Sequence, residues 1–175
     1  MSNMGERLSF GMMAGFFAIR DLLWPPSEKL RHGPVEEGFQ VLDYACGPGG
    51  YSVAAARMVG EGGTVYAADV SEMAIASVRK RALKAGLSNI KTILTDCRTG
   101  LTDESIDIVL LFDTYHDLKD PGAVMKELHR VLKPSEILLF SDHHMKHDQI
   151  VREIEKAGLF ELTTEISGIY RYARK

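Results

Sequence analysis

Apolar positions along the chain follow two patterns, short continuous runs and helical spacing. Segments of the two kinds alternate regularly. Short apolar runs bounded by turn residues predict strands near 39–45, 64–69, 90–95, 106–112 and 136–142. Between them, apolar residues recur at helical spacing near 51–59, 72–86, 121–132 and 147–158. Strands that alternate with helices predict an α/β fold, a doubly wound and mostly parallel sheet with helices on both faces.

The end of the chain has a different pattern. Residues 160–166 and 169–173 each have the pattern of a strand, and Ser167-Gly168 between them is a tight turn. Two strands joined by so short a turn run antiparallel. We therefore expect the sheet to end in an antiparallel strand pair.

The first apolar stretch stands apart from this alternation. A helix over residues 10–24 would be apolar nearly all round, and Pro25-Pro26 would end it. The most continuous apolar stretch of this region is residues 8–19. The stretch is too short to cross a bilayer and lacks a signal-peptide cleavage site, so we expect no stable membrane insertion. A helix this apolar must be covered by its own domain, a partner or a substrate. We divide the chain into 1–36, a lid or the interface of a homodimer, and 37–175, the main domain.

Composition limits the function classes. A chain of 175 residues suits a single domain with a proper core, and a net charge of −3 leaves no electrostatic footprint for nucleic acid. The two cysteines, Cys46 and Cys97, are not placed like a structural disulfide. We therefore expect a reducing compartment, the cytoplasm.

The most informative stretch is VLDYACGPGG, residues 41–50. An apolar strand leads through Asp43 into a turn in which Gly47 and Gly49 let a ligand lie against the main chain, and the next helix points free N–H groups at it. Asp43 would repel a dinucleotide pyrophosphate but attract the ammonium group of S-adenosylmethionine. The dinucleotide fingerprint also fails at Ser52, where close helix packing needs Gly or Ala.

A second strand ends in Asp69, twenty residues beyond Gly49, where a carboxylate can accept both hydroxyls of a ribose. Four segments in order, VLDYACGPGG, VYAADVSEMA, ILTDCRTGL and SIDIVLLFDTYHDLKDPGAVMKELHRVLKP followed by ILLFSDH, resemble the class I S-adenosylmethionine-dependent methyltransferases. The likeness runs from about Phe39 to the C-terminus and is nearest to quinone and other small-molecule methyltransferases. It implies a seven-stranded Rossmann-like sheet, S-adenosylmethionine as cofactor, and a small, partly apolar methyl acceptor.

The resemblance also implies cofactor contacts at particular positions. Asp69 would accept the ribose hydroxyls, the alternative being a helix N-cap before Ser71, and Asp96 would accept the adenine amino group with the Cys97 N–H beside it. Ala45 stands where the family usually has the first glycine of its loop, which costs little if Ala45 is extended. The implied cofactor-binding residues are Asp43, Ala45, Gly47, Gly49, Asp69, Val70, Met73, Asp96, Cys97 and Asp113.

Two histidines are candidates for catalysis. His116 follows the fourth strand, and a histidine has an ordinary pKa near working pH, so it could take a proton from an acceptor. The alternative is that His116 packs over the cofactor or caps the helix that begins near Asp120. His143 belongs to a histidine-rich run, 142–148, whose spacing resembles a metal site. Related metal-dependent enzymes use oxygen ligands, so we expect no metal and assign these histidines to substrate contacts or caps.

The sequence leaves three rival functions open. A non-catalytic S-adenosylmethionine-binding protein would need the same cofactor pocket without an acceptor site. A NAD-dependent oxidoreductase would share the glycine turn, and a protein methyltransferase would need an extended docking groove. The acceptor atom, whether carbon, nitrogen, oxygen or sulfur, also stays open.

Overall fold

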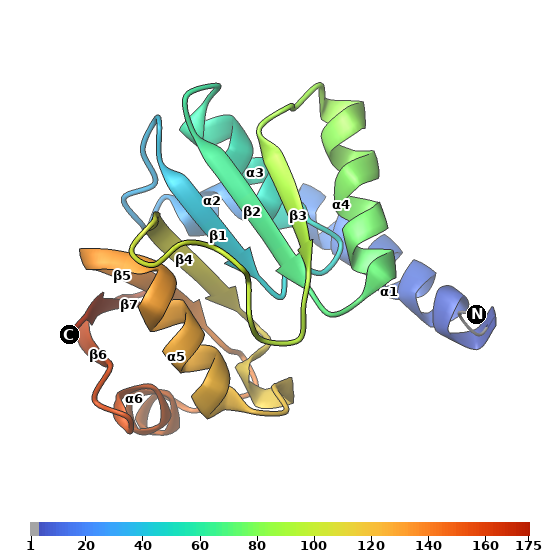
Figure 1. Ribbon diagram of the computed structural model, residues 1–175. Coiled ribbons are helices and arrows are strands. Elements are labelled where there is room, and N and C mark those ends of the chain that lie inside the picture. The colour runs from blue at the N-terminus through green and yellow to red at the C-terminus, as the bar shows by residue number, and fades with distance from the viewer. Residues whose placement is uncertain (1–3) are drawn as a thin grey trace.

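The structure is a computed structural model that describes residues 4–175. Seven strands form one sheet in the order β3-β2-β1-β4-β5-β7-β6 (Figure 1). Strands β1 to β5 run parallel, and β7 runs antiparallel to both β5 and β6. This confirms the predicted doubly wound sheet with its C-terminal antiparallel pair. The strands are β1 Gln40–Tyr44, β2 Thr64–Asp69, β3 Ile90–Leu94, β4 Ile106–Phe112, β5 Leu132–Ser141, β6 Phe160–Ile166 and β7 Ile169–Arg174.

The described residues form six α-helices and one short 3-10 helix, of which α1 and α2 precede the first strand. Two segments differ from the predicted pattern. Strand β5 starts directly after a helix, because buried Leu132 pairs with Ile106 across the sheet before Pro134. A short helix also follows the proline pair, since the fixed φ of a proline suits the first position of a helix. The helices are α1 Met4–Leu23, α2 Pro26–Leu30, α3 Gly50–Val59, α4 Glu72–Ala85, η1 Tyr115–Asp117, α5 Pro121–Val131 and α6 His147–Glu155.

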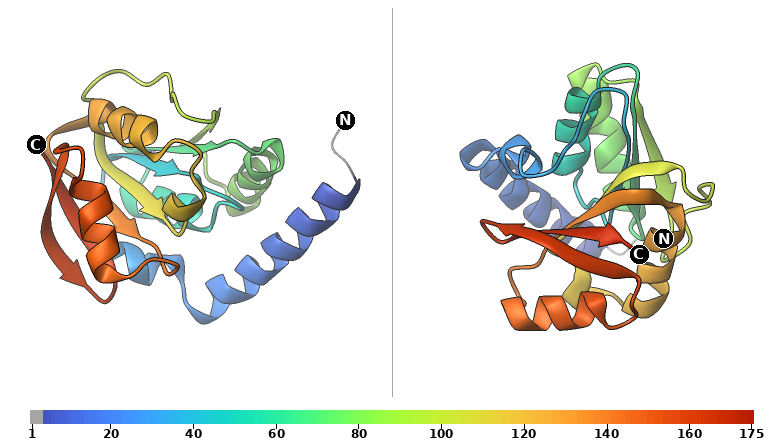
Figure 2. Two further views of the ribbon diagram at one scale, coloured as in Figure 1. Left: turned by 90° about the horizontal axis from the view of Figure 1, so that it is seen from below. Right: turned by 90° about the vertical axis from the view of Figure 1, so that its left-hand side faces the viewer.

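Helices cover both faces of the sheet, as Figure 2 shows. Successive residues of a strand point to opposite faces, so Ile108 and Leu110 of β4 pack with α2 and α3. Val109 and Leu111 point the other way, into a second core with α5 and α6. Both faces of the central strands are therefore buried, which explains why their sequence is apolar without interruption.

The functional end of the fold follows from the strand order. The chain winds from β1 toward β3 in one direction and from β4 toward β5 in the other, so the order reverses between β1 and β4. In open α/β sheets, ligands bind at such a switch point, outside the carboxyl ends of the strands. The glycine turn begins there, directly after β1.

Helix α1 is held to the body at its C-terminal half and projects from it at the other end (Figure 2, left). Asp21 accepts a hydrogen bond from Arg81 on α4, over 3.3 Å. The same carboxylate occupies the space that a Cβ on Gly50 would need, so this glycine seats α1 against the start of α3. No helix in the described part of the chain is long and apolar enough to span a membrane.

Candidate cofactor and acceptor site

Gly47 and Gly49, the two glycines of the turn, have different structural roles. Both have positive φ, +50° at Gly47 and +89° at Gly49, which other residues adopt at a cost. A Cβ on Gly49 would lie 2.7 Å from Cγ2 of Val78, so Gly49 lets α4 approach the turn. A Cβ on Gly47 would meet no described atom within 4 Å, and Gly47 lines a cavity. Gly47 therefore leaves room for a ligand, whereas Gly49 serves packing.

Ala45 corrects one expectation from the sequence. Its φ is +57°, in the left-handed region, so the extended conformation under which alanine would cost little here is not adopted. The main chain bends here because the N–H of Cys46 donates to the carbonyl oxygen of Ala68 on β2, over 3.0 Å. A residue with a Cβ pays about 1–2 kcal/mol for this conformation. Asp113, at the end of β4, has a similar φ of +53°.

Asp43 lies beneath the turn and is almost fully buried. The hydroxyl of Ser52 donates a hydrogen bond to its Oδ2 atom, over 2.5 Å. Burial raises the pKa of Asp43 to about 7, and the hydrogen bond from Ser52 acts in the opposite direction. Asp43 is not among the residues that line the cavity.

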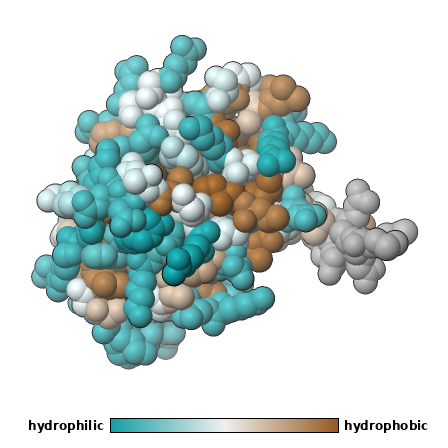
Figure 3. Space-filling model, in the orientation of Figure 1, coloured by the Kyte–Doolittle hydropathy of each residue, from teal (hydrophilic) through white to brown (hydrophobic). Residues whose placement is uncertain are grey.

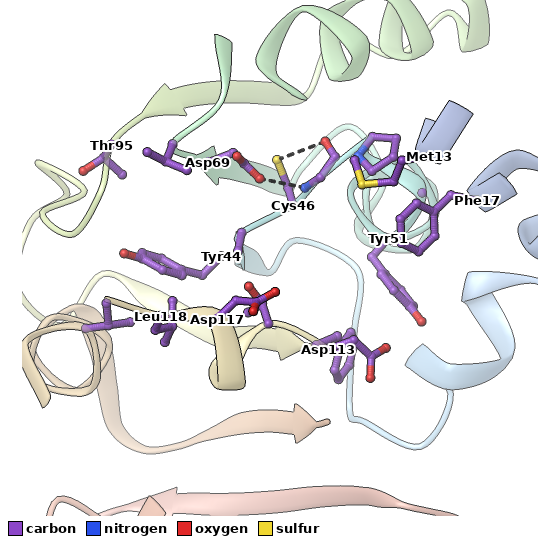
Figure 4. Close-up of a pocket in the computed structure, with 18 of the residues that line it drawn as sticks. Met13, Phe17, Tyr44, Cys46, Tyr51, Asp69, Thr95, Asp113, Asp117 and Leu118 are labelled. Carbon is purple, nitrogen blue, oxygen red and sulfur yellow. Dashed lines mark hydrogen bonds between the residues drawn. The ribbon is translucent and has the colours of Figure 1, made fainter. Parts of the chain in front are cut away.

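A cavity of about 360 Å³ opens at the carboxyl ends of β1, β2, β3 and β4, with part of α1 along one side (Figure 4). The predicted cofactor-binding residues divide into two groups around it. Those that line the cavity are Ala45, Gly47, Asp69, Val70, Asp96 and Asp113. Those outside its lining are Asp43, Gly49, Met73 and Cys97.

Asp69 faces the cavity and organises the turn beside it. Its Oδ2 atom accepts the N–H of Gly47 over 2.9 Å, and its Oδ1 atom accepts the N–H of Ser71 over 2.8 Å. Ser71 is itself the N-cap of α4, so Asp69 does not hold that position. The N–H of Cys97, predicted to face adenine, donates to Thr95 Oγ1 over 3.2 Å.

A second cavity, of about 730 Å³, adjoins the first. It lies among the α1–α2 junction, the residues that follow β5, and the turn between β6 and β7. Arg20, Tyr51 and Asp113 line both cavities. Neither Arg20 nor Tyr51 is among the site residues that the sequence predicts. Tyr51 directly follows the glycine turn, a signal that could have pointed to it, whereas Arg20 lies in a helix far from any motif.

Asp113 contacts Lys29 and His143 at the boundary between the cavities. Its Oδ2 atom lies 3.2 Å from Lys29 Nζ, and its Oδ1 atom lies 3.0 Å from Nδ1 of His143. Burial would raise the pKa of Asp113, but the Lys29 ammonium and the bond to His143 together hold it below the usual value. Burial in turn lowers the pKa of Lys29. The Lys29 ammonium also lies 4.4 Å from the centre of the Phe112 ring, a favourable cation–π contact.

His116 is held from two directions. Its Nδ1 atom lies 2.8 Å from Oδ2 of the buried Asp142, and its Nε2 atom lies 3.3 Å from Oδ2 of Asp117. The hydrogen bond to Asp142 raises the pKa of His116. His116 lines neither of the two cavities, and the N-cap of α5 is Asp120, so His116 does not cap that helix.

The other histidines of the run have separate partners. His143 lines the second cavity, whereas the Nδ1 atom of His147 lies 3.2 Å from the hydroxyl of Tyr170. His144 packs against the rings of His116 and His143. Among residues 4–175, no group of three or more histidine, cysteine, aspartate or glutamate side chains is arranged to hold a metal ion.

The sequence and the fold match known proteins. Residues 35–167 match the family model described as a methyltransferase domain, which is well over half of the chain. The chain belongs to this methyltransferase domain family. A solved structure of a S-adenosylmethionine-dependent methyltransferase from Aquifex aeolicus superimposes with a TM-score of 0.78 at 27% identity, covering 88% of this chain and 91% of that one.

Curated relatives give further detail. The chain is 33% identical over 119 residues to the demethylmenaquinone methyltransferase of Geobacillus stearothermophilus, covering 67% of this chain and 50% of that protein. It is 27% identical to a ubiquinone/menaquinone biosynthesis C-methyltransferase of Cellvibrio japonicus strain Ueda107, covering 79% and 59%. The chain thus spans about half the length of the curated relatives it matches first.

S-adenosylmethionine is the cofactor that this methyltransferase family implies, and the lining of the first cavity fits it. Among the described residues that line this cavity, six are aspartates and two, Arg20 and Lys119, are cations. A lining so rich in carboxylates suits a ligand with sulfonium and ammonium groups and opposes one with phosphates. The cavity volume also lies within the range of about 300–1,000 Å³ that is typical of ligand sites.

Proposed function

We propose that this chain transfers the methyl group of S-adenosylmethionine to a small, partly apolar, quinone-like molecule. The observation that carries the proposal is that two adjacent cavities share Arg20, Tyr51 and Asp113. A cofactor in the first cavity and an acceptor in the second would meet at these residues. The names of the curated relatives support an acceptor of the quinone kind.

The proposed cofactor contacts follow the cavity lining. Asp69, at the end of β2, accepts the ribose hydroxyls, and Asp96, after β3, accepts the adenine amino group. Asp43 attracts the cofactor's ammonium group from beneath the turn. Gly47 leaves the space in which the ligand lies against the main chain. The reacting end then lies toward Asp113.

The second cavity suits a flat, apolar acceptor that carries an oxygen. Its described walls include Trp24, Met145 and Tyr170, and Lys29 and His143 face it beside Asp113. Methyl transfer from a sulfonium is an in-line displacement, so the protein must chiefly align the acceptor and exclude water. We assign Lys29 to hold an ionised acceptor oxygen, and His143 to take a proton from an acceptor that arrives protonated.

Helix α1 is proposed as a lid over the cofactor. Met13 and Phe17 line the first cavity from its inner face, close to Tyr51 (Figure 4). The guanidinium of Arg20 lies 4.4 Å from the centre of the Phe17 ring and 5.5 Å from that of Tyr51. These contacts would tie α1 to the cavity wall, and a lid of this kind keeps water from the reacting atoms.

The rival functions fit the site less well. The excess of aspartates in the first cavity disfavours the phosphates of a nicotinamide cofactor. A non-catalytic S-adenosylmethionine-binding protein would have no need of the second cavity. Figure 3 shows hydrophobic residues near the middle of one face. Both described cavities have the volume of small-molecule sites, whereas a protein acceptor would need an extended docking groove.

The proposal is tested by incubating the protein with S-adenosylmethionine and a fractionated extract, and following the release of S-adenosylhomocysteine. We expect release with fractions that contain small apolar molecules. Lys29→Met should lower turnover about tenfold or more, the effect of losing a hydrogen bond to a charged group, and should leave cofactor affinity nearly unchanged. Lys91→Met, on the exposed side of β3, is the matched control. Tight cofactor binding with no release from any fraction would instead favour the non-catalytic alternative.

A further inference from the structure

The outer face of α1 is apolar and exposed in the described chain. Six large side chains on it are each at least 62% exposed. They recur three or four residues apart, so they share one side of the helix, opposite Phe17 and Asp21. They are Leu8, Met12, Phe16, Ile19, Leu22 and Leu23. The cofactor cavity therefore accounts for one face of α1, and on the other face only Leu23, at the end of the helix, lines a described cavity, the second one.

The same face carries a notch. Gly11 and Gly15 lie within the apolar stripe, and a Cβ on either would meet no described atom within 4 Å. Glycine weakens a helix by about 1 kcal/mol relative to alanine, so two of them four residues apart need a reason. Small residues at this spacing let the backbone of a second helix approach closely.

The exposed area suits a protein partner. Phe16 alone can bury roughly 150–250 Å² and the other five side chains are somewhat smaller, so the six present on the order of 800 Å². A standard interface buries about the same area on each partner. The stripe alone could therefore supply most of a stable contact, and a self-complementary stripe can pair with its own copy about a two-fold axis.

Charge argues against an anionic lipid surface as the occupant. The charged residues in the sequence of α1 are two acids and two bases, Glu6, Arg7, Arg20 and Asp21, and the whole chain carries a net charge of −3. Arg20 also lies 2.7 Å from Oδ1 of Asp21, so its charge is already paired. Helices that bind membrane surfaces usually carry many unpaired lysines and arginines along the polar face.

We propose that α1 pairs through Gly11, Gly15 and the apolar stripe around them with α1 of a second copy of this chain, forming a homodimer. The pairing uses the face of α1 that points away from the cofactor cavity. It would hold each helix over its own cavity, since Met13 and Phe17 on the inner face line that cavity. This inference does not depend on the identity of the methyl acceptor.

Sedimentation of the full chain over a range of micromolar concentrations, without ligand, tests the proposal. We expect a dimer that Ile19→Glu converts to a monomer without a change in the circular dichroism of the fold. Leu83→Glu is the matched control, because Leu83 is 84% exposed on α4, away from the stripe. It should remain dimeric. A wild-type monomer at every concentration, or an Ile19→Glu dimer, would overturn the proposal.

A second variant distinguishes close helix packing from nonspecific hydrophobic association. Gly15→Leu strengthens the helix and enlarges the apolar stripe but fills the notch, so we expect the dimer to weaken about tenfold or more, the scale of overpacking a tight contact. A tighter dimer in the Gly15→Leu variant would overturn the proposal that the helices pack closely at Gly11 and Gly15. Flotation with phosphatidylcholine–phosphatidylglycerol vesicles completes the test. If the wild type is a monomer that binds the vesicles, and Ile19→Glu abolishes this binding, the stripe is assigned to a lipid surface instead.

Discussion

The hydroxyl of Ser52 donates a hydrogen bond to the buried carboxylate of Asp43, across 2.5 Å beneath the glycine turn. This pair explains why serine stands where a dinucleotide-binding turn has Gly or Ala. Ser52 is fully buried, and its hydroxyl supplies a hydrogen bond to the buried carboxylate of Asp43, which Gly or Ala could not do. Asp43, with a pKa raised to about 7 by burial, is therefore poised to respond to a charge placed above it.

Binding of S-adenosylmethionine near pH 7 is expected to release a proton from Asp43. A cationic ligand favours the ionised carboxylate and lowers its pKa, so affinity should rise as pH increases through about 7. Calorimetry in phosphate and in Tris, which differ in ionisation enthalpy, counts the protons released. Asp43→Asn keeps the shape and should remove the release. Equal binding heats in the two buffers for the wild type would contradict this assignment.

Asp69→Ala is expected to weaken cofactor binding by roughly 2 kcal/mol or more, because hydrogen bonds between a ribose and a carboxylate are charge-assisted. Asp69 also accepts the N–H groups of Gly47 and Ser71, so the variant should unfold at a lower temperature as well. Asp69→Asn keeps one acceptor oxygen and is the control. Calorimetric titration with S-adenosylmethionine measures the effect. An unchanged affinity in Asp69→Ala would remove Asp69 from the ribose site.

Ala45→Gly should stabilise the protein by about 0.5–1 kcal/mol. The left-handed conformation of Ala45 costs about 1–2 kcal/mol, and glycine avoids this cost while losing somewhat more entropy on folding. Ala54→Gly, inside α3, is the matched control and should destabilise by a similar amount. Urea unfolding of the ligand-free proteins gives both values. Destabilisation in both variants would mean that Ala45 pays no conformational cost in solution.

His116→Asn is expected to destabilise the fold more at pH 6 than at pH 9. The bond to Asp142 raises the pKa of His116 in the folded state above its ordinary 6.5. Its contribution is therefore complete below about 6.5 and is lost as pH rises through the raised pKa. The expected loss at low pH is roughly 1 kcal/mol or more. Thermal unfolding across this range measures it, with His32→Asn, in the turn after α2, as control. A loss that does not vary with pH would show that His116 is not held as a cation.

Trp24 offers a direct signal for the second cavity. It is the single tryptophan of the chain, and it lines this cavity but not the first. An aromatic acceptor that stacks there should change the tryptophan emission, whereas S-adenosylmethionine alone should change it much less. Fluorescence titration with a quinone-like probe measures the response, and Trp24→Phe removes the signal. Quenching of equal size by cofactor and probe would argue against separate cavities.

The order of strands and helices could be predicted from the sequence because it depends on local periodicity. Each of these signals, an apolar run, helical spacing or the turn at Ser167-Gly168, is set by residues only a few positions apart in the sequence. The carboxyl ends of parallel strands then bring Asp69 and Asp113 to one edge without further information. The exposed outer face of α1 could not be predicted in this way, since an apolar pattern does not say what covers it.

The sequence by itself determined the parallel sheet, the glycine turn and the acids that follow the strands. Only the tertiary structure decided what each of these residues contacts. It places Asp43 under the cavity rather than in its wall, sets Gly49 against Val78, and pairs Lys29 with Asp113, 84 residues away. The physical reason is that periodicity specifies which side of an element is apolar, whereas the direction of a polar side chain and the sign of φ depend on contacts made between distant segments.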